Sequence, residues 1–239
     1  MSPDFLILCA TLPEMSYFLS AHPPESKKPT RTGLTVFSGS IHHKPYDLMI
    51  TGPGVFNAVH ALTVYLEQSL PSLILQTGIA GVFRETGLNI GDVAIATEEH
   101  YIHTGLATDS PVKVPLPFDL IESFPLTREG RYPFASDLVE PYYEKLSREF
   151  AFGKIRMAKG HFITVSAISA SFKQASLIYS SFSPVMEAME GAGSAHIAAL
   201  YKIPMIEIRA ASNFVGERDK GKWDMEKAAK NLEAVCVFI

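Results

Sequence analysis

The chain has 239 residues, of which 47% are hydrophobic and 19% charged, with a formal net charge of −4. That length can bury a large core and is common for one α/β domain, so we expect a single domain over residues 1–239. The sequence has no block of Lys and Arg. A phosphate backbone needs a basic stripe, so nucleic acid is excluded as an expected partner.

The cysteines and the hydropathy of the chain indicate the cellular compartment in which the protein is expected. Cys9 and Cys236 lie in apolar runs near opposite ends of the chain, which predicts buried thiols rather than a disulfide framework. The apolar run 5–10 is too short for a signal peptide, and no apolar stretch approaches the roughly 20 residues of a membrane span. We therefore expect a cytoplasmic protein without a membrane partner.

Short apolar runs alternate with helical patterns along the chain. This alternation predicts an α/β fold, with a central mixed, mostly parallel twisted sheet flanked by helices. Such sheets bind ligands beyond the carboxyl ends of their strands. The predicted strands are 5–10, 46–52, 72–78, 91–98 and 203–212, and the clearest predicted helices are 55–68 and 191–202.

The second half of the chain is less regular. Prolines recur between residues 108 and 133, which predicts a long surface excursion rather than a linker between domains. Residues 136–150 are expected to be helical, with Pro141 as a position where the helix could begin. A charged segment follows Asn213, and an amphipathic helix is expected from about Trp223.

Glu14 follows the first predicted strand, in the run ATLPEM (10–15). Pro13 suits the first turn of a helix, where a Glu next to it could simply complement the helix dipole. The functional alternative is a carboxylate at the mouth of the sheet that accepts a proton from water.

Glu190 lies in a run of apolar and small residues (184–200) that should be buried. A buried carboxylate is costly unless it is paired or hydrogen-bonded. Sugar hydroxyls could supply those bonds, and a structural ion pair is the alternative. Glu187, three residues earlier, could face solvent. Together with His196 the two carboxylates could also be metal ligands, but such spacing belongs to helical bundles, so we expect no metal and no cofactor.

Other polar positions also follow strands. Asn213 comes after the last predicted strand, where an Asn is usually a turn or capping residue. Arg209, on that strand, could pair with a buried carboxylate. The runs 51–58 and 76–83 contain glycines that let backbone approach a ligand closely, but neither ends in the Lys-Ser/Thr of a P-loop.

Taken in order, these segments resemble the nucleoside phosphorylase and nucleosidase superfamily. The similarity runs from ATLPEM through TGPGVFNA, QTGIAGVF and AMEGAG to RAASNFVGERD, with Trp223 beyond. Within it, the chain is more similar to methylthioadenosine/adenosylhomocysteine nucleosidases, and more similar still to futalosine hydrolases of menaquinone biosynthesis.

The resemblance implies roles for single residues. Glu14 matches the acid that orients and deprotonates the attacking water, and Asn213 falls where the methylthioadenosine enzymes place a catalytic Asp. Residues 161–171 match the lining of the base pocket. Substrate-binding roles are implied for Met189 and Glu190 at the ribose, for Arg209 and Ser212 as supports of the water and base sites, and for Gly78 and Tyr101.

Asn213 also bears on the identity of the base. Hypoxanthine presents a carbonyl beside N7, to which an Asn amide can donate while its oxygen accepts from protonated N7. Adenine presents an amine there, and each mismatched buried group costs about 1–3 kcal/mol. Asn213 therefore points to a 6-oxopurine nucleoside, and futalosine carries hypoxanthine. Because Asn cannot supply the proton for N7, solvent or another group must.

Gln76 separates hydrolysis from phosphorolysis. Similar phosphorylases place an Arg at its position to grip phosphate, and a neutral amide cannot replace that charge-assisted hold. We therefore predict hydrolysis of futalosine to hypoxanthine and dehypoxanthine futalosine. The alternatives are a methylthioadenosine/adenosylhomocysteine nucleosidase, a purine nucleoside phosphorylase, and a nucleoside-binding protein without turnover.

The resemblance also implies a homodimer or larger homo-oligomer, in which a neighbour's loop closes the 5′ side of the pocket. Tyr101 and His103 match that region by position, and their alternative is an ordinary loop role.

Overall fold

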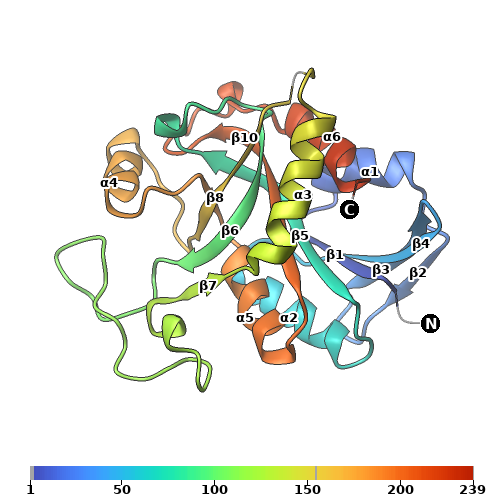
Figure 1. Ribbon diagram of the computed structural model, residues 1–239, viewed down its shortest axis with the longest axis horizontal. Helices are drawn as coiled ribbons and strands as arrows, with labels where there is room; N and C mark the ends of the chain where they lie inside the picture. The colour runs from blue at the N-terminus through green and yellow to red at the C-terminus, as the bar shows by residue number, and fades with distance from the viewer. Residues whose placement is uncertain (1–2, 154, 239) are drawn as a thin grey trace.

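The computed structural model describes residues 3–153 and 155–238 (Figure 1). One mixed sheet runs through it, in the order β2-β3-β4-β1-β5, and from β5 it continues through β10, β6, β8 and β9 back to β5. The strands are β1 (Phe5–Cys9), β2 (Ser26–Pro29), β3 (Thr35–Ile41), β4 (Lys44–Ile50), β5 (Leu73–Val82), β6 (Val93–Tyr101), β7 (Arg131–Pro133, paired with β6), β8 (Met157–Thr164), β9 (Met186–Ala188) and β10 (Met205–Phe214).

The predicted α/β class is confirmed, and the sheet is mixed as expected. β1 pairs in parallel with both β4 and β5, and β5 pairs in parallel with β10, whereas β6 runs antiparallel to β10. The closure of one end of the sheet into a small barrel was not predicted. It arises because the short β9 bridges β8 and β5.

The central strand β1 is buried on both faces, which is why its sequence is continuously apolar. Phe5, Ile7 and Cys9 face one core, which α3 and α6 cover, whereas Leu6 and Leu8 face the other, which α2 and α5 cover. The helices are α1 (Ser16–Ala21), α2 (Val55–Leu66), α3 (Ser136–Glu149), α4 (Phe172–Phe182), α5 (Gly191–Tyr201) and α6 (Met225–Cys236). α2 and α5 lie side by side (Figure 1).

The start of α3 differs from the position near Pro141 that the sequence offered as a possible start. α3 begins at Ser136, and Pro141 lies inside the helix rather than at its first residue. The missing N–H of this proline removes one backbone hydrogen bond of the helix, while Val139 and Leu146 on the same helix are buried in the core.

The proline-rich excursion lies between β6 and β7 and projects from the body of the molecule (Figure 1). The buried Thr127 organises its second half, because its hydroxyl accepts from the backbone N–H groups of Leu120 and Ile121. Both cysteines are free and buried, as predicted. Within residues 3–153 and 155–238, no helix has the length and apolarity to cross a bilayer.

Candidate active site

A cavity of about 290 Å³ lies where β1, β5 and β10 end, as expected for parallel strands. The structure brings five of the predicted site residues to its wall. They come from the loop after β1, from the start of α5 and from the end of β10. They are Glu14, Met189, Glu190, Ser212 and Asn213.

Glu14 sits in the 3-10 turn Pro13–Met15 directly after β1, and its residue is 6% exposed. The Ile79 backbone N–H donates to its Oε2 at 2.9 Å, and the Thr11 hydroxyl donates to its Oε1. The thiol of Cys9 lies 3.6 Å from Oε2, and burial raises the pKa of that thiol. Donors from two strand ends thus hold the carboxylate at the cavity wall.

Gly78 separates Glu14 from Arg209. Its φ of +142° disfavours other residues, and a Cβ there would lie 2.5 Å from Glu14 Oε2 and 2.8 Å from Arg209 Nη1. Gly78 and Arg209 are opposite each other in the β5–β10 pairing. Gly78 does not line the cavity; its bare Cα lets the two side chains approach each other.

Arg209 is fully buried and bridges two carboxylates. Its Nη2 lies 3.1 Å from Glu190 Oε2, and its Nε donates to Glu207 Oε1 at 2.8 Å. Burial opposes the charged guanidinium, but Glu207 and Glu190 outweigh it and raise the pKa of Arg209. Glu190 thus makes the ion pair considered as its alternative and also lines the cavity, and the Gly54 N–H donates to its Oε1 at 2.9 Å.

Three adjacent strands form the other end of the cavity. In register, Asn213 of β10 lies beside Gly81 of β5, which lies beside Glu187 of β9. Asn213 and Glu187 therefore lie on either side of Gly81, and all three line the cavity; we call this end of the cavity the slot. The Ser212 hydroxyl donates to Asn213 Oδ1 at 2.8 Å.

Glu187 does not face solvent, which corrects the expectation from its position in the sequence. It is 6% exposed, lines the cavity, and accepts from the backbone N–H of Ser169 at 3.1 Å and from its hydroxyl. Burial raises the pKa of Glu187, although the bonds from Ser169 oppose the shift. The neighbouring wall includes Val165 and Ile168, within the segment 161–171 singled out in the sequence.

Tyr101 is not in the cavity wall. Its hydroxyl lies 2.7 Å from Ser166 Oγ, next to the wall residue Val165, and its ring contacts His103 edge to face. The backbone N–H of Ser166 donates to His103 Nδ1. A role for Tyr101 at the 5′ side stays a prediction.

The possible metal ligands point to different partners. Glu187 is held by Ser169, Glu190 by Arg209, and His196 lies 2.9 Å from the Tyr132 hydroxyl. Among the residues that the structure describes, no three His, Cys, Asp or Glu side chains converge on a metal position.

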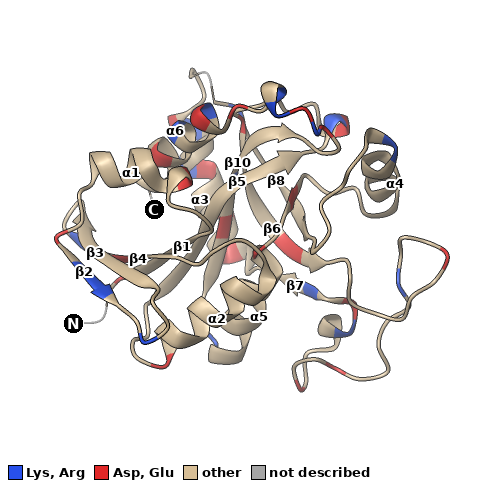
Figure 2. Cartoon of the chain, turned by 180° about the vertical axis from the view of Figure 1, so that it is seen from behind, with Lys and Arg blue, Asp and Glu red and all other residues tan. Residues whose placement is uncertain are grey.

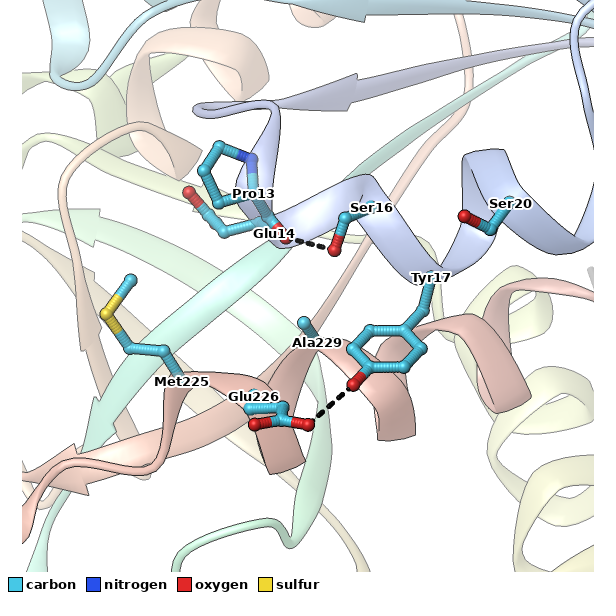
Figure 3. A pocket seen from close by; sticks show the side chains of 8 residues that line it. All are labelled: Pro13, Glu14, Ser16, Tyr17, Ser20, Met225, Glu226 and Ala229. Atoms are coloured by element: carbon cyan, nitrogen blue, oxygen red, sulfur yellow. Dashed lines mark hydrogen bonds between the residues drawn. The ribbon is translucent and has the colours of Figure 1, made fainter.

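A second hollow, of about 420 Å³, lies between α1 and α6 (Figure 3). It also reaches Glu14, but most of its other polar groups bond to each other or to the backbone: the Tyr17 hydroxyl donates to Glu226 and the Ser16 hydroxyl donates to the carbonyl of Pro13, both at 2.8 Å. It contains neither Glu190 nor Asn213. We therefore place the site in the cavity at the strand ends.

Two buried acids behind the cavity wall were missed in the sequence. Glu207 on β10 and Glu99 on β6 are both fully buried, and acidic positions occur within the central strands as well as on the surface (Figure 2). A charged residue inside the apolar run IPMIEIR was the available signal for Glu207.

The fold is that of nucleosidases of known structure. The 5′-methylthioadenosine/S-adenosylhomocysteine nucleosidase from Neisseria meningitidis, in complex with methylthio-immucillin-A, superposes with a TM-score of 0.81 at 20% identity, covering 98% of this chain and 96% of that one. Futalosine hydrolase of Helicobacter pylori gives a TM-score of 0.80 at 19% identity, covering 99% and 96%.

The chain belongs to the Phosphorylase superfamily, whose pattern matches residues 4–237. It is 29% identical over 193 residues to a futalosine hydrolase from Acidothermus cellulolyticus, covering 80% of this chain and 74% of the relative. It is 26% identical over 197 residues to a 5′-methylthioadenosine/S-adenosylhomocysteine nucleosidase from Bacillus licheniformis, covering 81% and 80%.

Proposed function

We propose that this protein is a nucleosidase that hydrolyses the N-glycosidic bond of a 6-oxopurine nucleoside, futalosine, releasing hypoxanthine and dehypoxanthine futalosine. The observation that carries the proposal is that Glu14 and Glu190, far apart in the sequence, line one cavity. Relatives named futalosine hydrolase and nucleosidase support it.

The two carboxylates suit two parts of the reaction. As the bond to the base stretches, the ribose gains oxocarbenium character, and a carboxylate on its hydroxyls stabilises that charge. Glu190 is placed for this role, with Met189 beside it. Glu14 takes the proton of the attacking water. A carboxylate accepts about four hydrogen bonds, so the bonds from Thr11 and from the Ile79 N–H leave room for the water.

The slot between Asn213 and Glu187 suits the base. Asn213 donates to the 6-carbonyl of hypoxanthine and accepts from N7 once that atom is protonated. Hypoxanthine also carries a hydrogen on N1, which an ionised Glu187 can accept, whereas N1 of adenine is an acceptor. The pairing therefore favours a 6-oxopurine.

Gln76 supports water rather than phosphate as the nucleophile. Its side chain is fully buried and bound within the protein, because Oε1 accepts from the Ser194 hydroxyl at 2.6 Å and Nε2 contacts the carbonyls of Leu8 and Thr77. It is not in the cavity wall.

The test is a chromatographic assay of purified protein with futalosine, inosine and methylthioadenosine, each with and without phosphate. We expect hypoxanthine from futalosine at a rate independent of phosphate. Release of adenine from methylthioadenosine with futalosine intact would assign the other nucleosidase activity, and a requirement for phosphate would assign a phosphorylase.

Two variants test the mechanism. Glu14→Gln and Glu190→Gln each remove a carboxylate charge at nearly constant shape, and we expect kcat to fall by about a hundredfold or more. Glu144→Gln is the control, since Glu144 is exposed and pairs with Arg148 on the surface. Full activity in both site variants would exclude the mechanism.

A further inference from the structure

Behind Arg209, two buried carboxyl groups face each other. Glu99 and Glu207 are both fully buried, and in the described part of the chain Glu99 Oε1 and Glu207 Oε2 have no other hydrogen-bond partner. Both oxygens adjoin the bare Cα of Gly191, where any Cβ would collide with them. Two ionised carboxylates in this arrangement would repel each other and leave two buried acceptors unsatisfied.

The remaining oxygens of the pair are occupied by directional bonds. Glu99 Oε2 accepts from the Thr164 hydroxyl at 2.6 Å, and that hydroxyl accepts from the Ala192 N–H at 2.9 Å. On the other side, Glu207 Oε1 accepts from Arg209 Nε at 2.8 Å.

Taken together, these contacts form a circuit that starts and ends at Glu190. Arg209 Nη2 binds its carboxylate at 3.1 Å, and Ala192, at the far end of the chain of bonds, lies two residues after Glu190 at the start of α5. The contact between Arg209 Nη2 and Glu190 is an ion pair, since Nη2 makes no hydrogen bond within the described residues, and the remaining gap is the space between Glu99 and Glu207.

We propose that Glu99 and Glu207 share one proton, which links the hydrogen bonds on either side of them and so holds Arg209, and the ion pair that it makes with Glu190, in their working positions. The proton resides on Glu99, which donates it to Glu207 Oε2. Glu207 then keeps the negative charge next to the guanidinium. Glu99 and Glu207 are positioning residues, because they do not line the cavity.

The charges around the pair favour this state. Burial and the neighbouring Glu207 raise the pKa of Glu99 well above its usual value, against Thr164 and Arg209. Burial also raises the pKa of Glu207, which Arg209 opposes and Glu190 reinforces. The single guanidinium of Arg209 therefore faces the carboxylates of Glu190 and Glu207. It cannot also balance a negative charge on Glu99, and the shared proton removes that charge.

The first test compares two substitutions at Glu99. In Glu99→Gln the amide donates to Glu207 and accepts from Thr164, as protonated Glu99 does, so we expect kcat/KM for futalosine within about threefold of wild type. Glu99→Met has a similar shape without the donor, and we expect kcat/KM to fall by at least about tenfold, the effect of about 1.4 kcal/mol.

A matched pair at Thr164 probes the same circuit from its other side. Thr164→Ser retains the hydroxyl, and we expect activity close to wild type. Thr164→Val retains the shape without the hydroxyl, so we expect the same loss as for Glu99→Met. Equal losses in the conservative and apolar variants at either position would overturn the proposal.

The second test does not depend on the substrate. A carboxyl that is protonated in the folded state loses its proton on unfolding, so its contribution to stability declines as pH rises. From pH 5 upward, as far as the raised pKa of Glu99 in the folded state, we expect the unfolding equilibrium constant of wild type to rise relative to that of Glu99→Gln, by at most about tenfold per pH unit. Parallel curves would show that no proton is shared, even in a protein that proves inactive on futalosine.

Discussion

At Gly78 the backbone passes between two charged groups that the proposed reaction requires. In Gly78→Ala the added Cβ would push against Glu14 and Arg209, and the φ of +142° would be strained. We expect kcat/KM to fall by about a hundredfold or more, because small displacements of catalytic groups have effects of that size.

Gly33→Ala is the matched control for this variant. Gly33 has a φ of +85° but no neighbour within 4 Å of the Cβ position. It should lose about 1 kcal/mol of stability from the backbone alone and keep its activity. Equal activity in the two variants would show that the space at Gly78 is not needed.

The base preference can be tested at a single atom. Asn213→Asp replaces the amide with a group that, when protonated, donates to N7 and accepts from the amine of adenine. We expect the ratio of kcat/KM for futalosine to that for its adenine counterpart to fall by about ten- to a hundredfold, the range set by one mismatched buried bond. An unchanged ratio would mean that Asn213 does not read the base.

Among the elements, the strands that place the site were the most predictable. β1, β5 and β10 are buried apolar runs, and α2 follows a clear helical period. β2 was missed because all its residues are exposed, so it has no apolar pattern. The barrel closure depends on β9, whose three residues are too few to show a period.

The predictable part of the site was the set of polar residues directly after strands. Glu14 and Asn213 stand where an α/β sheet binds ligands, and the resemblance assigned their roles. Glu99 was beyond reach, because its significance lies in facing Glu207 across the β6–β10 end of the sheet. A sequence shows that a buried acid needs a partner but not which one meets it in space.

The start of α6 links a helix to the site strand. Asp224 caps the helix by accepting from the Lys227 N–H at 2.9 Å, and its own N–H donates to the carbonyl of Ser212 at 2.8 Å. We expect Asp224→Ala to lower the free energy of unfolding by about 1 kcal/mol, and Asp224→Asn to retain most of it, since Asn also caps helices. Chemical denaturation measures both, and equal losses would contradict the capping role.

For the whole molecule, three half-buried histidines lower stability as the pH falls. Burial lowers the pKa of His100 from 6.5 to about 4, and it lowers the pKa values of His161 and His196 as well. A depressed histidine pKa contributes stability above pH 6.5, and this is lost as the pH falls toward 4. The slope is at most about 1.4 kcal/mol per pH unit for each histidine and smaller where water reaches the ring.

The raised pKa values of Glu99, Glu187 and Glu207 act in the opposite direction, so the test is a difference between proteins. Between pH 6.5 and 5 we expect the melting temperature of wild type to fall relative to that of His100→Gln. A constant difference in melting temperature between the two proteins over this range would contradict the shift at His100. Calorimetry at several pH values checks the prediction.

The excursion exposes apolar side chains that the folded chain itself does not cover. Phe118 is 57% exposed, and Leu106, Val112 and Val114 are each about half exposed. Several exposed apolar side chains on one segment are typical of an interface, in line with the homodimer that the resemblance implies. We expect sedimentation to show a dimer that Phe118→Glu weakens; a monomeric wild type would contradict this.

Closure of the sheet at one end also limits aggregation through exposed strand edges. Strands inside the barrel have neighbours on both sides, which leaves β2 and the short β7 as edges in the described residues. Both end in a proline, Pro29 and Pro133, and β2 carries Lys27 and Lys28. Prolines and lysines block the addition of further strands, so replacing Lys27, Lys28 and Pro29 by valine would open a template for fibre-like aggregation.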